Sequence, residues 1–222
     1  MAFREIDPKE LTGNPFERIG SQWMLVTAGD QNRYNTMTAS WGGLGVMWGK
    51  NVAYTVIRPQ RYTYEFMESN DTYTLSFYGK EYKTALNFCG SKSGRDVDKF
   101  AETRLTPQKS RYVKAPGIEE SPVNIECKVV EVKELGSHDM FIAKVMGVTV
   151  DERYMNDKGK FNLNASGLVT YSHGEYFELG KRLGSFGYSV KRPAKKRGPG
   201  NRGAKTSGAS GGAGTKSRRT KG

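Results

Sequence analysis

Short runs of β-branched, aromatic and aliphatic residues, separated by polar turns, recur along most of this chain. Runs of this kind are typical of β-strands. They predict strands over these ranges: 22–28, 33–40, 52–57, 72–77, 123–135, 140–150 and 168–171. Residues 136–139, Gly-Ser-His-Asp, separate the two longest runs and predict a hairpin there. Residues 1–20 contain two prolines and several charges, so we expect an irregular lead-in.

Helical spacing is confined to short segments. The apolar residues of 62–69 recur at helical spacing, which predicts one short helix. Two further short helices are expected at 84–89 and 97–101, on either side of a loop. Because strands outnumber helices and the connections are short, the pattern predicts a mainly β (α+β) fold: an antiparallel barrel with a few short helices.

Charge and composition divide the chain at residue 190. The full chain has 35 Lys and Arg against 23 Asp and Glu, and residues 191–222 hold 11 of those basic residues and no acidic one. Residues 1–190 are therefore nearly neutral, and we expect one folded domain there. Residues 191–222 are rich in glycine, serine and basic residues and lack large apolar side chains, which predicts disorder.

The basic segment 191–222 has two open interpretations. Its charge favours weak, salt-dependent binding to RNA, DNA or other polyanions. It contains no aromatic residue, so base stacking is not expected. The alternative is a solubilising or dispensable tail.

The cysteines, histidines and apolar runs limit which kinds of site and cellular location are expected. Cys89 and Cys127 are the only cysteines, and with two dispersed histidines they offer no metal-ligand spacing, so no metal site is expected. The charged N-terminus is unlike a secretory signal, and no run of about eighteen apolar residues predicts a membrane span. We therefore expect a reduced, cytoplasmic protein. No Rossmann fingerprint or serine-hydrolase motif is present.

The stretch 35–63, NTMTASWGGLGVMWGKNVAYTVIRPQRYT, carries the clearest candidate chemistry. Residues 38–40 are small enough for a flat ring to lie close to the backbone. The glycines of 42–45 predict a loop with access to positive φ. Arg58 and Arg61 flank a proline and can donate charge-assisted hydrogen bonds to a phosphate. This combination suits a bound aromatic phosphate.

A second candidate is the loop from Cys89 to Asp96, which is rich in small polar residues. Gly90 and Gly94 permit a ligand to approach the backbone closely. The loop lacks P-loop spacing, and its alternative role is to connect two helices, with Asp96 as a cap. Cys89 has Lys92 nearby but no histidine to activate a thiol, so a packing role is favoured for it.

Four motifs, in this order and spacing, carry a resemblance to a known family. They are NTMTASWGG, IRPQRYT, CGSKSGRDVDKF and HGEYFELGKRLG, at residues 35–43, 57–63, 89–100 and 173–184. The chain resembles the flavoredoxin-like flavin reductases, which have the FMN-binding split-barrel fold. The likeness runs from about residue 23 to residue 190 and leaves out the basic segment.

The resemblance implies non-covalently bound FMN. By this resemblance the arginine turn would hold the phosphate, and the strand end before it would line the ring and the ribityl chain. The cofactor-binding residues that it implies are Thr38, Ala39, Ser40, Trp41, Arg58, Arg61, Tyr62, Thr63, Cys89, Gly90, Lys92 and Ser93. His173 is implied to face the nicotinamide or the flavin, and it is the candidate catalytic residue.

Several of these residues also have a packing or surface alternative. The two arginines could pack on Tyr54 or Tyr62. Trp41 could be a core residue, and His173 could lie in an exposed loop. His138 lies in the predicted hairpin turn and is expected to be solvated.

The leading functional interpretation is an FMN-dependent oxidoreductase that uses NAD(P)H, namely a flavin reductase. One alternative is a flavoredoxin-type electron carrier, which has no NAD(P)H site and serves a redox partner protein. Another is a protein tethered to nucleic acid through its basic segment. The family places FMN near a subunit interface, so the resemblance also implies a homodimer.

Overall fold

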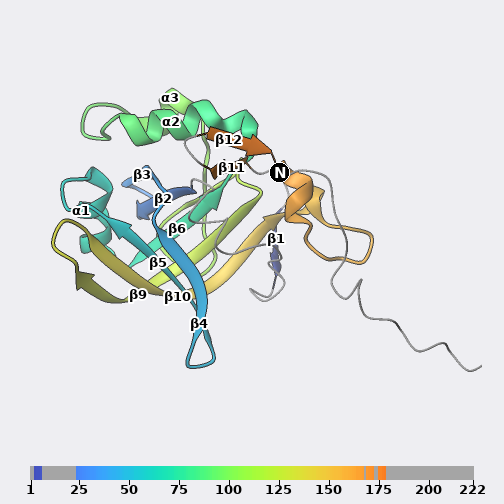
Figure 1. Ribbon diagram of the computed structural model, residues 1–222, viewed down its shortest axis with the longest axis horizontal. Coiled ribbons are helices and arrows are strands. Elements are labelled where there is room, and N and C mark those ends of the chain that lie inside the picture. Colours follow the sequence, from blue (N-terminus) through green and yellow to red (C-terminus); the bar gives the residue numbers. More distant parts are fainter. Residues whose placement is uncertain (1–2, 7–23, 168, 173–174, 179–222) are drawn as a thin grey trace, which may run out of the picture. The chain divides into compact units, whose positions relative to one another are not determined.

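An antiparallel eight-stranded sheet organises the part of the chain that the computed structural model describes, residues 3–6, 24–167, 169–172 and 175–178 (Figure 1). Seven strands follow the order β3-β2-β6-β9-β10-β5-β4, and β1 pairs with β10 outside this path. Their bounds are β1 (Phe3–Ile6), β2 (Met24–Gly29), β3 (Tyr34–Ala39), β4 (Gly42–Met47), β5 (Lys50–Ile57), β6 (Thr72–Phe77), β9 (Val123–Glu134) and β10 (Asp139–Asp151).

Three short α-helices and small pieces of other structure complete the described residues. The α-helices are α1 (Tyr62–Ser69), α2 (Lys83–Ser91) and α3 (Lys99–Thr103). Two small hairpins are formed by β7 (Pro107–Gln108) with β8 (Gly117–Ile118) and by β11 (Val169–Ser172) with β12 (Glu175–Glu178). Single 3₁₀ turns lie at Lys80–Tyr82, Glu152–Tyr154 and Leu163–Ser166. The mainly β architecture with a few short helices confirms the predicted fold class.

Most predicted elements are confirmed, and two predictions are wrong. The strand at 72–77 and the helix at 62–69 have the predicted bounds. The glycines of 42–45 were expected in a loop but lie in β4, and the positive φ angles of this hairpin belong to Trp48 and Gly49. The lead-in, residues 1–20, was expected to be irregular, but residues 3–6 form β1, which pairs with β10; residues 1–2 and 7–20 lie outside the described residues. The basic segment 191–222 lies outside the described residues, and its disorder remains a prediction.

Glycine in β4 allows an aromatic ring to lie against the strand. Gly43 pairs with Tyr54 of β5, and a Cβ atom added at Gly43 would lie 2.3 Å from Cε1 of that tyrosine. A side chain at this position would therefore displace the ring. Glycine is required here for close approach rather than for a turn.

Two apolar clusters hold β2 between the inside of the barrel and the helices. Met24 and Val26 belong to the barrel core, whereas Leu25 packs with the α2–α3 side, beside Leu86 and Phe100. This alternation follows the period of two of a β-strand. Because both faces are covered, β2 and β6 are buried along their whole length. Helices α2 and α3 lie together on this face in Figure 1.

A buried ammonium group ties the outer edge of β3 to α2. Nζ of Lys99 donates to the carbonyl oxygen of Thr36 at 2.8 Å and to that of Cys89 at 2.7 Å. Burial lowers the pKa of Lys99 to about 8; the Cys89 thiol opposes this shift, and the positive charge of Arg61 adds to it. The ammonium group therefore makes the hydrogen bond to the Thr36 carbonyl oxygen that a neighbouring strand would otherwise make.

The burial of Lys99 predicts a pH-dependent contribution to stability. Its pKa in the folded chain, about 8, lies below the ordinary value of 10.5, so between these values the unfolded chain binds more protons. The free energy of unfolding should therefore rise with pH across this window through Lys99, and Lys99→Met should lack that rise. The test is urea unfolding at about pH 7.5 and pH 10. The free energy of unfolding of the wild type minus that of Lys99→Met should be larger at the higher pH by on the order of 2 kcal/mol.

Other titrating groups are common to both proteins, so the comparison isolates Lys99. Lys109→Met, at an exposed lysine, is the matched control and should keep the wild-type pH dependence. The same pH dependence in wild type and Lys99→Met would contradict a lowered pKa for Lys99.

Candidate functional site

The outer edge of β3 is where the predicted site residues begin to meet. β3 ends the sheet order, so among the described residues β2 is its only strand neighbour. The hydroxyl of Thr38 donates to the carbonyl oxygen of Leu86 on α2 at 2.5 Å. A Cβ atom at Gly90 would lie 3.2 Å from the Cβ of Thr38, so glycine allows the end of α2 to approach the strand closely. The motifs at 35–43 and 89–100 are therefore neighbours in space.

Beyond Ala39, the chain crosses from β3 to β5 and exposes an indole ring. The carbonyl oxygen of Trp41 accepts from the amide of Val56 at 3.1 Å. Ala39 is buried and Ser40 is half-buried, whereas 57% of Trp41 is exposed. The alternative that Trp41 is a core residue is wrong. Its ring lies against the imidazole of His138, with centroids 4.8 Å apart.

His138 connects this indole to the arginine turn. Nε of Arg58 donates to Nε2 of His138 at 3.0 Å, and Nδ1 of His138 lies 2.9 Å from the hydroxyl oxygen of Ser137. Because a guanidinium only donates, Nε2 must be the acceptor nitrogen of the imidazole. His138 lies in the turn between β9 and β10, as expected, and it is half-buried rather than fully solvated because it contacts both Arg58 and Trp41.

The position of His138 is set by a pairing that is distant in sequence. Asp139 pairs with Ile57, so the β9–β10 turn lies beside the end of β5, immediately before Arg58. No local pattern around 136–139 contains this information. Only the order of strands in the sheet would have indicated it.

Arg61 and Thr63 lie at the start of α1, which follows the arginine turn. The amide of Arg61 donates to the carbonyl oxygen of Arg58 at 3.0 Å, which closes the turn. Both arginine side chains are exposed, as a phosphate contact requires. Thr63 is buried, and its hydroxyl oxygen accepts from Nδ2 of Asn35 at 2.8 Å. Thr63 therefore ties α1 to β3, and a direct contact with phosphate remains a prediction for it.

The loop between α2 and α3 is folded on itself. Ser93 accepts from the amide of Arg95 through its hydroxyl and from the amides of Asp96 and Val97 through its carbonyl oxygen. Lys92 is exposed and Ser93 is half-buried. The residue that caps α3 is Asp98, not Asp96, because the Asp98 carboxylate accepts from two amides of the first turn at 3.0 and 3.1 Å.

Cys89 is a packing residue. It is 1% exposed within the cluster that includes Leu86 and Phe100. Burial raises the pKa of its thiol to about 11, which is opposite to the shift that a nucleophilic thiolate needs. Cys127 is also buried, and burial raises its pKa well above the ordinary value. A flavin contact by Cys89 itself remains a prediction.

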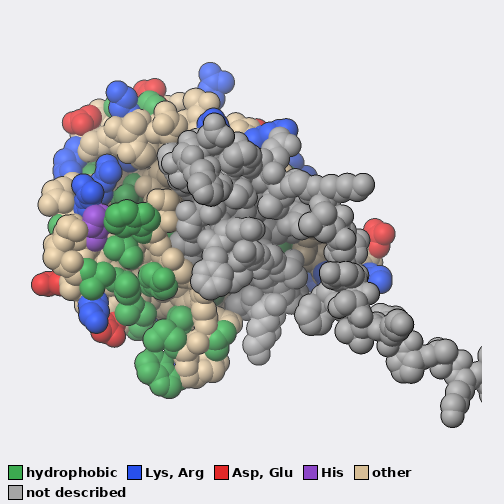
Figure 2. Space-filling view, in the orientation of Figure 1, with side chains coloured by type: hydrophobic (Ala, Val, Ile, Leu, Met, Phe, Trp, Pro, Cys, Tyr) green, Lys and Arg blue, Asp and Glu red, His purple; other side chains and the backbone are tan. Residues whose placement is uncertain are grey.

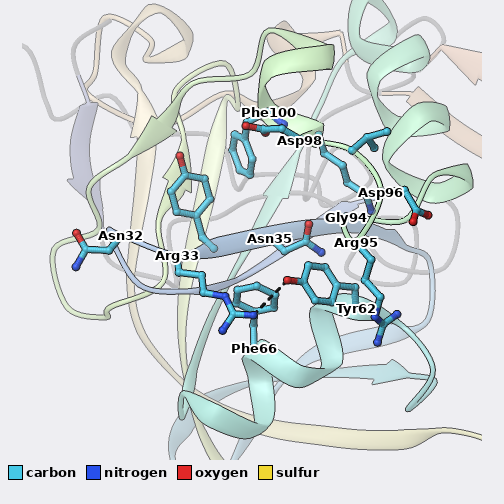
Figure 3. A pocket seen from close by; sticks show the side chains of 13 residues that line it. Asn32, Arg33, Asn35, Tyr62, Phe66, Gly94, Arg95, Asp96, Asp98 and Phe100 are labelled. Atoms are coloured by element: carbon cyan, nitrogen blue, oxygen red, sulfur yellow. Dashed lines mark hydrogen bonds between the residues drawn. The ribbon is translucent and has the colours of Figure 1, made fainter.

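A cavity of about 470 Å³ lies between α1 and the α2–α3 loop (Figure 3). Among the predicted cofactor residues, only Tyr62 lines it. Asn35, which bonds Thr63, also lines it, and so does Gly94, which follows Ser93. The cavity therefore adjoins the predicted flavin site but is a separate site.

Some predicted features lie beyond these contacts. His173 is outside the described residues, and its catalytic role remains a prediction. The described residues contain no group of three His, Cys, Asp or Glu side chains arranged to hold a metal ion. None of the helices in the described part of the chain combines the length and the apolar character that crossing a membrane requires.

Comparison with known proteins agrees with this geometry. A family model, the flavin reductase like domain, matches residues 16–180. A protein of Pyrococcus abyssi is 30% identical over 152 residues, which cover 68% of this chain and 86% of that protein.

Solved structures share the fold. Flavoredoxin of Desulfovibrio vulgaris has a TM-score of 0.69 and 29% identity, covering 82% of this chain and 96% of that one. An FMN-binding protein from Thermus thermophilus, with bound 1-cyclohex-2-enone, has a TM-score of 0.62 and 23% identity, covering 83% of this chain and 99% of that one. The resemblance drawn from the four motifs is confirmed, and the chain belongs to the flavin reductase like domain family, with its split-barrel fold.

Proposed function

We propose that this chain is an FMN-dependent oxidoreductase whose flavin is reduced by NAD(P)H. The observation that carries the proposal is the meeting of the Arg58–Arg61 turn with the exposed Trp41 and the end of β3. Residues 39–41 and 58–61 come from two parts of the sequence, and His138, from a third, contacts both Arg58 and Trp41. They present cations, an aromatic face and a backbone edge at one place, which are the groups that a phosphorylated aromatic ring needs.

The residues present fit FMN. Arg58 and Arg61 would hold its phosphate through charge-assisted hydrogen bonds. The backbone of residues 38–41 would lie along the ring, where donors and acceptors tune the electron chemistry that a flavin supplies. Gly90 keeps the end of α2 close to this strand and leaves no side chain between them. Lys92 and Ser93 would approach from the loop between α2 and α3.

His138 is a positioning residue in this proposal. Its imidazole accepts from Arg58 and lies against the ring of Trp41, so it fixes one phosphate-binding group and one ring-lining group together. A guanidinium that is already held loses less side-chain entropy when a phosphate binds.

A flavoredoxin-type electron carrier is the second candidate. The 29% identity to flavoredoxin of Desulfovibrio vulgaris over 82% of this chain favours it. A carrier would bind FMN through the same residues and would receive electrons from a redox partner protein. The two candidates therefore differ in the electron donor alone.

Substitution of either arginine should weaken FMN binding. Arg58→Ala and Arg61→Ala should each cost about 1.5–3 kcal/mol of binding free energy, the usual range for a hydrogen bond to a charged group. Quenching of flavin fluorescence during titration measures the change. Arg111→Ala, which removes an exposed arginine paired with Glu5, is the control and should bind FMN as the wild type does. Unchanged affinity in both site variants would contradict the phosphate assignment.

Anaerobic reduction separates the enzyme from the carrier. The FMN-loaded chain should lose its visible flavin absorbance when NADH or NADPH is added without oxygen. Dithionite, which reduces any accessible flavin, is the positive control. A flavin that dithionite bleaches but neither nucleotide does would support the carrier. A purified chain that takes up no FMN would contradict both candidates.

We also propose that the chain is a homodimer that uses the β4–β5 hairpin. Val46 is 68% exposed, Met47 40% and Trp48 89%, and Figure 2 shows hydrophobic side chains gathered over this hairpin. Trp48 also has a φ of 48°, which is unfavourable for a bulky residue. Apolar side chains at an exposed hairpin tip fit burial against a second copy.

Charge introduced at the hairpin should therefore dissociate the dimer. Val46→Glu together with Trp48→Glu should halve the mass measured by light scattering after size-exclusion chromatography. Val130→Glu is the control, at a valine of β9 with 65% exposure, and should leave the mass unchanged. A wild-type chain that elutes as a monomer at all concentrations would contradict the homodimer.

A further inference from the structure

The cavity between α1 and the α2–α3 loop has features that FMN binding does not explain. Its volume of about 470 Å³ falls within the usual range for small-molecule sites. Figure 3 shows Arg33, Tyr62 and Phe66 on one side of it, and Asp98 and Phe100 on the other. The proposed flavin residues, apart from Tyr62, lie outside its lining.

Aromatic rings line both sides of the cavity. Tyr62 and Phe66 of α1 form an edge-to-face pair with centroids 5.0 Å apart. Tyr34 and Phe100 form a second such pair at 4.9 Å. Both tyrosines are half-buried, so part of each ring is accessible to a ligand. Rings in this arrangement offer stacking surfaces for a base, which tolerate any base because each has a π-face.

Two guanidinium groups lie over the rings of α1. The guanidinium carbon of Arg33 is 4.9 Å from the centroid of Phe66, and that of Arg95 is 4.9 Å from the centroid of Tyr62. Arg95 is paired with Glu65, whereas Arg33 donates to the hydroxyl of Tyr62 at 3.2 Å. Among the described residues, no carboxylate forms an ion pair with Arg33. Its charge is therefore available to an anion.

Carboxylates line the cavity as well, on the α3 side. Asp98 lies across from Arg33 in Figure 3, and Asp96 is exposed at the adjoining loop. The cavity thus offers a cation on one wall and hydrogen-bond acceptors on another. A bare phosphate would meet repulsion from the carboxylates. A ligand with a phosphate at one end and an amino-substituted ring at the other satisfies both walls.

We propose that this cavity binds the adenosine half of NADPH, with the 2′-phosphate on Arg33 and the adenine against the aromatic rings. The inference rests on the proposed use of NAD(P)H as electron donor. The cavity is suitably placed because it shares Tyr62 with the flavin residues and adjoins Ser93 and Thr63 through Gly94 and Asn35. Because NADPH has the 2′-phosphate that Arg33 would bind and NADH lacks it, NADPH is the preferred electron donor in this proposal.

Direct titration tests the site without any electron transfer. Adenosine 2′,5′-bisphosphate is added to the FMN-loaded full chain in a calorimeter, with 5′-AMP and inorganic phosphate as comparison ligands. The bisphosphate should bind more tightly than either of the others. Arg33→Gln should weaken it about tenfold, the loss of one charge-assisted hydrogen bond, and Arg33→Lys should restore part of the affinity. Arg111→Gln is the matched control and should bind as the wild type does.

Steady-state kinetics gives the second readout. Arg33→Gln should raise KM for NADPH by about tenfold, leave KM for NADH nearly unchanged, and leave FMN affinity unchanged. Equal bisphosphate affinity in wild type and Arg33→Gln would overturn the assignment. So would inorganic phosphate binding as tightly as the bisphosphate.

The failure of this site and the failure of the proposed function give different results. Bisphosphate binding that depends on Arg33, in a chain whose flavin neither nucleotide reduces, would support the site and count against the reductase. Flavin reduction by both nucleotides, without any bisphosphate binding, would support the reductase and overturn the site.

Discussion

The outer edge of β3 is the constraint on which the candidate site depends. An edge strand presents unpaired N–H and C=O groups, which proteins usually cover or pair. Here Lys99 covers the middle of the strand through the carbonyl oxygen of Thr36, and Thr38 is bonded to α2. These contacts add to the apolar packing of Leu86 and Phe100 against Leu25, and together they hold the α2–α3 segment along β3. The loop that carries Lys92 and Ser93 thereby reaches the arginine turn, where Arg95 donates to the carbonyl oxygen of Gln60 at 3.2 Å.

Sequence periodicity was sufficient to predict two kinds of element: those stabilised by local interactions, and those in which residue type alternates regularly between the two faces. The helix at 62–69 has an apolar stripe that packs on β2 and β3, and it begins just after the turn that contains Pro59. Four of the six residues of the strand at 72–77 are of types that favour strands, namely two threonines, a tyrosine and a phenylalanine. β4 was missed because its glycines have no strand preference. It exists because β5 supplies the pairing partners, among them Tyr54, which needs Gly43 opposite it.

The site was predictable where one motif supplies adjacent residues, as in the arginine turn. It was not predictable where distant strands decide which residues meet. His138 reaches Arg58 only because Asp139 pairs with Ile57, and Arg33 reaches Tyr62 only because α1 packs beside β3. The start of the chain shows the same limit, since β1 is a strand through its pairing with β10, in which Phe3 is opposite Asp151, 148 residues away.

The burial of both thiols affects how readily peroxide would oxidise them if the chain binds a flavin as proposed. Reduced flavins can pass electrons to oxygen, and the peroxide formed attacks cysteine as the thiolate. Cys89 adjoins the segment that faces the proposed cofactor, yet its raised pKa keeps it protonated and its surroundings exclude solvent. Cys127 is shielded in the same way within the barrel. Neither thiol is therefore exposed as the thiolate that peroxide attacks.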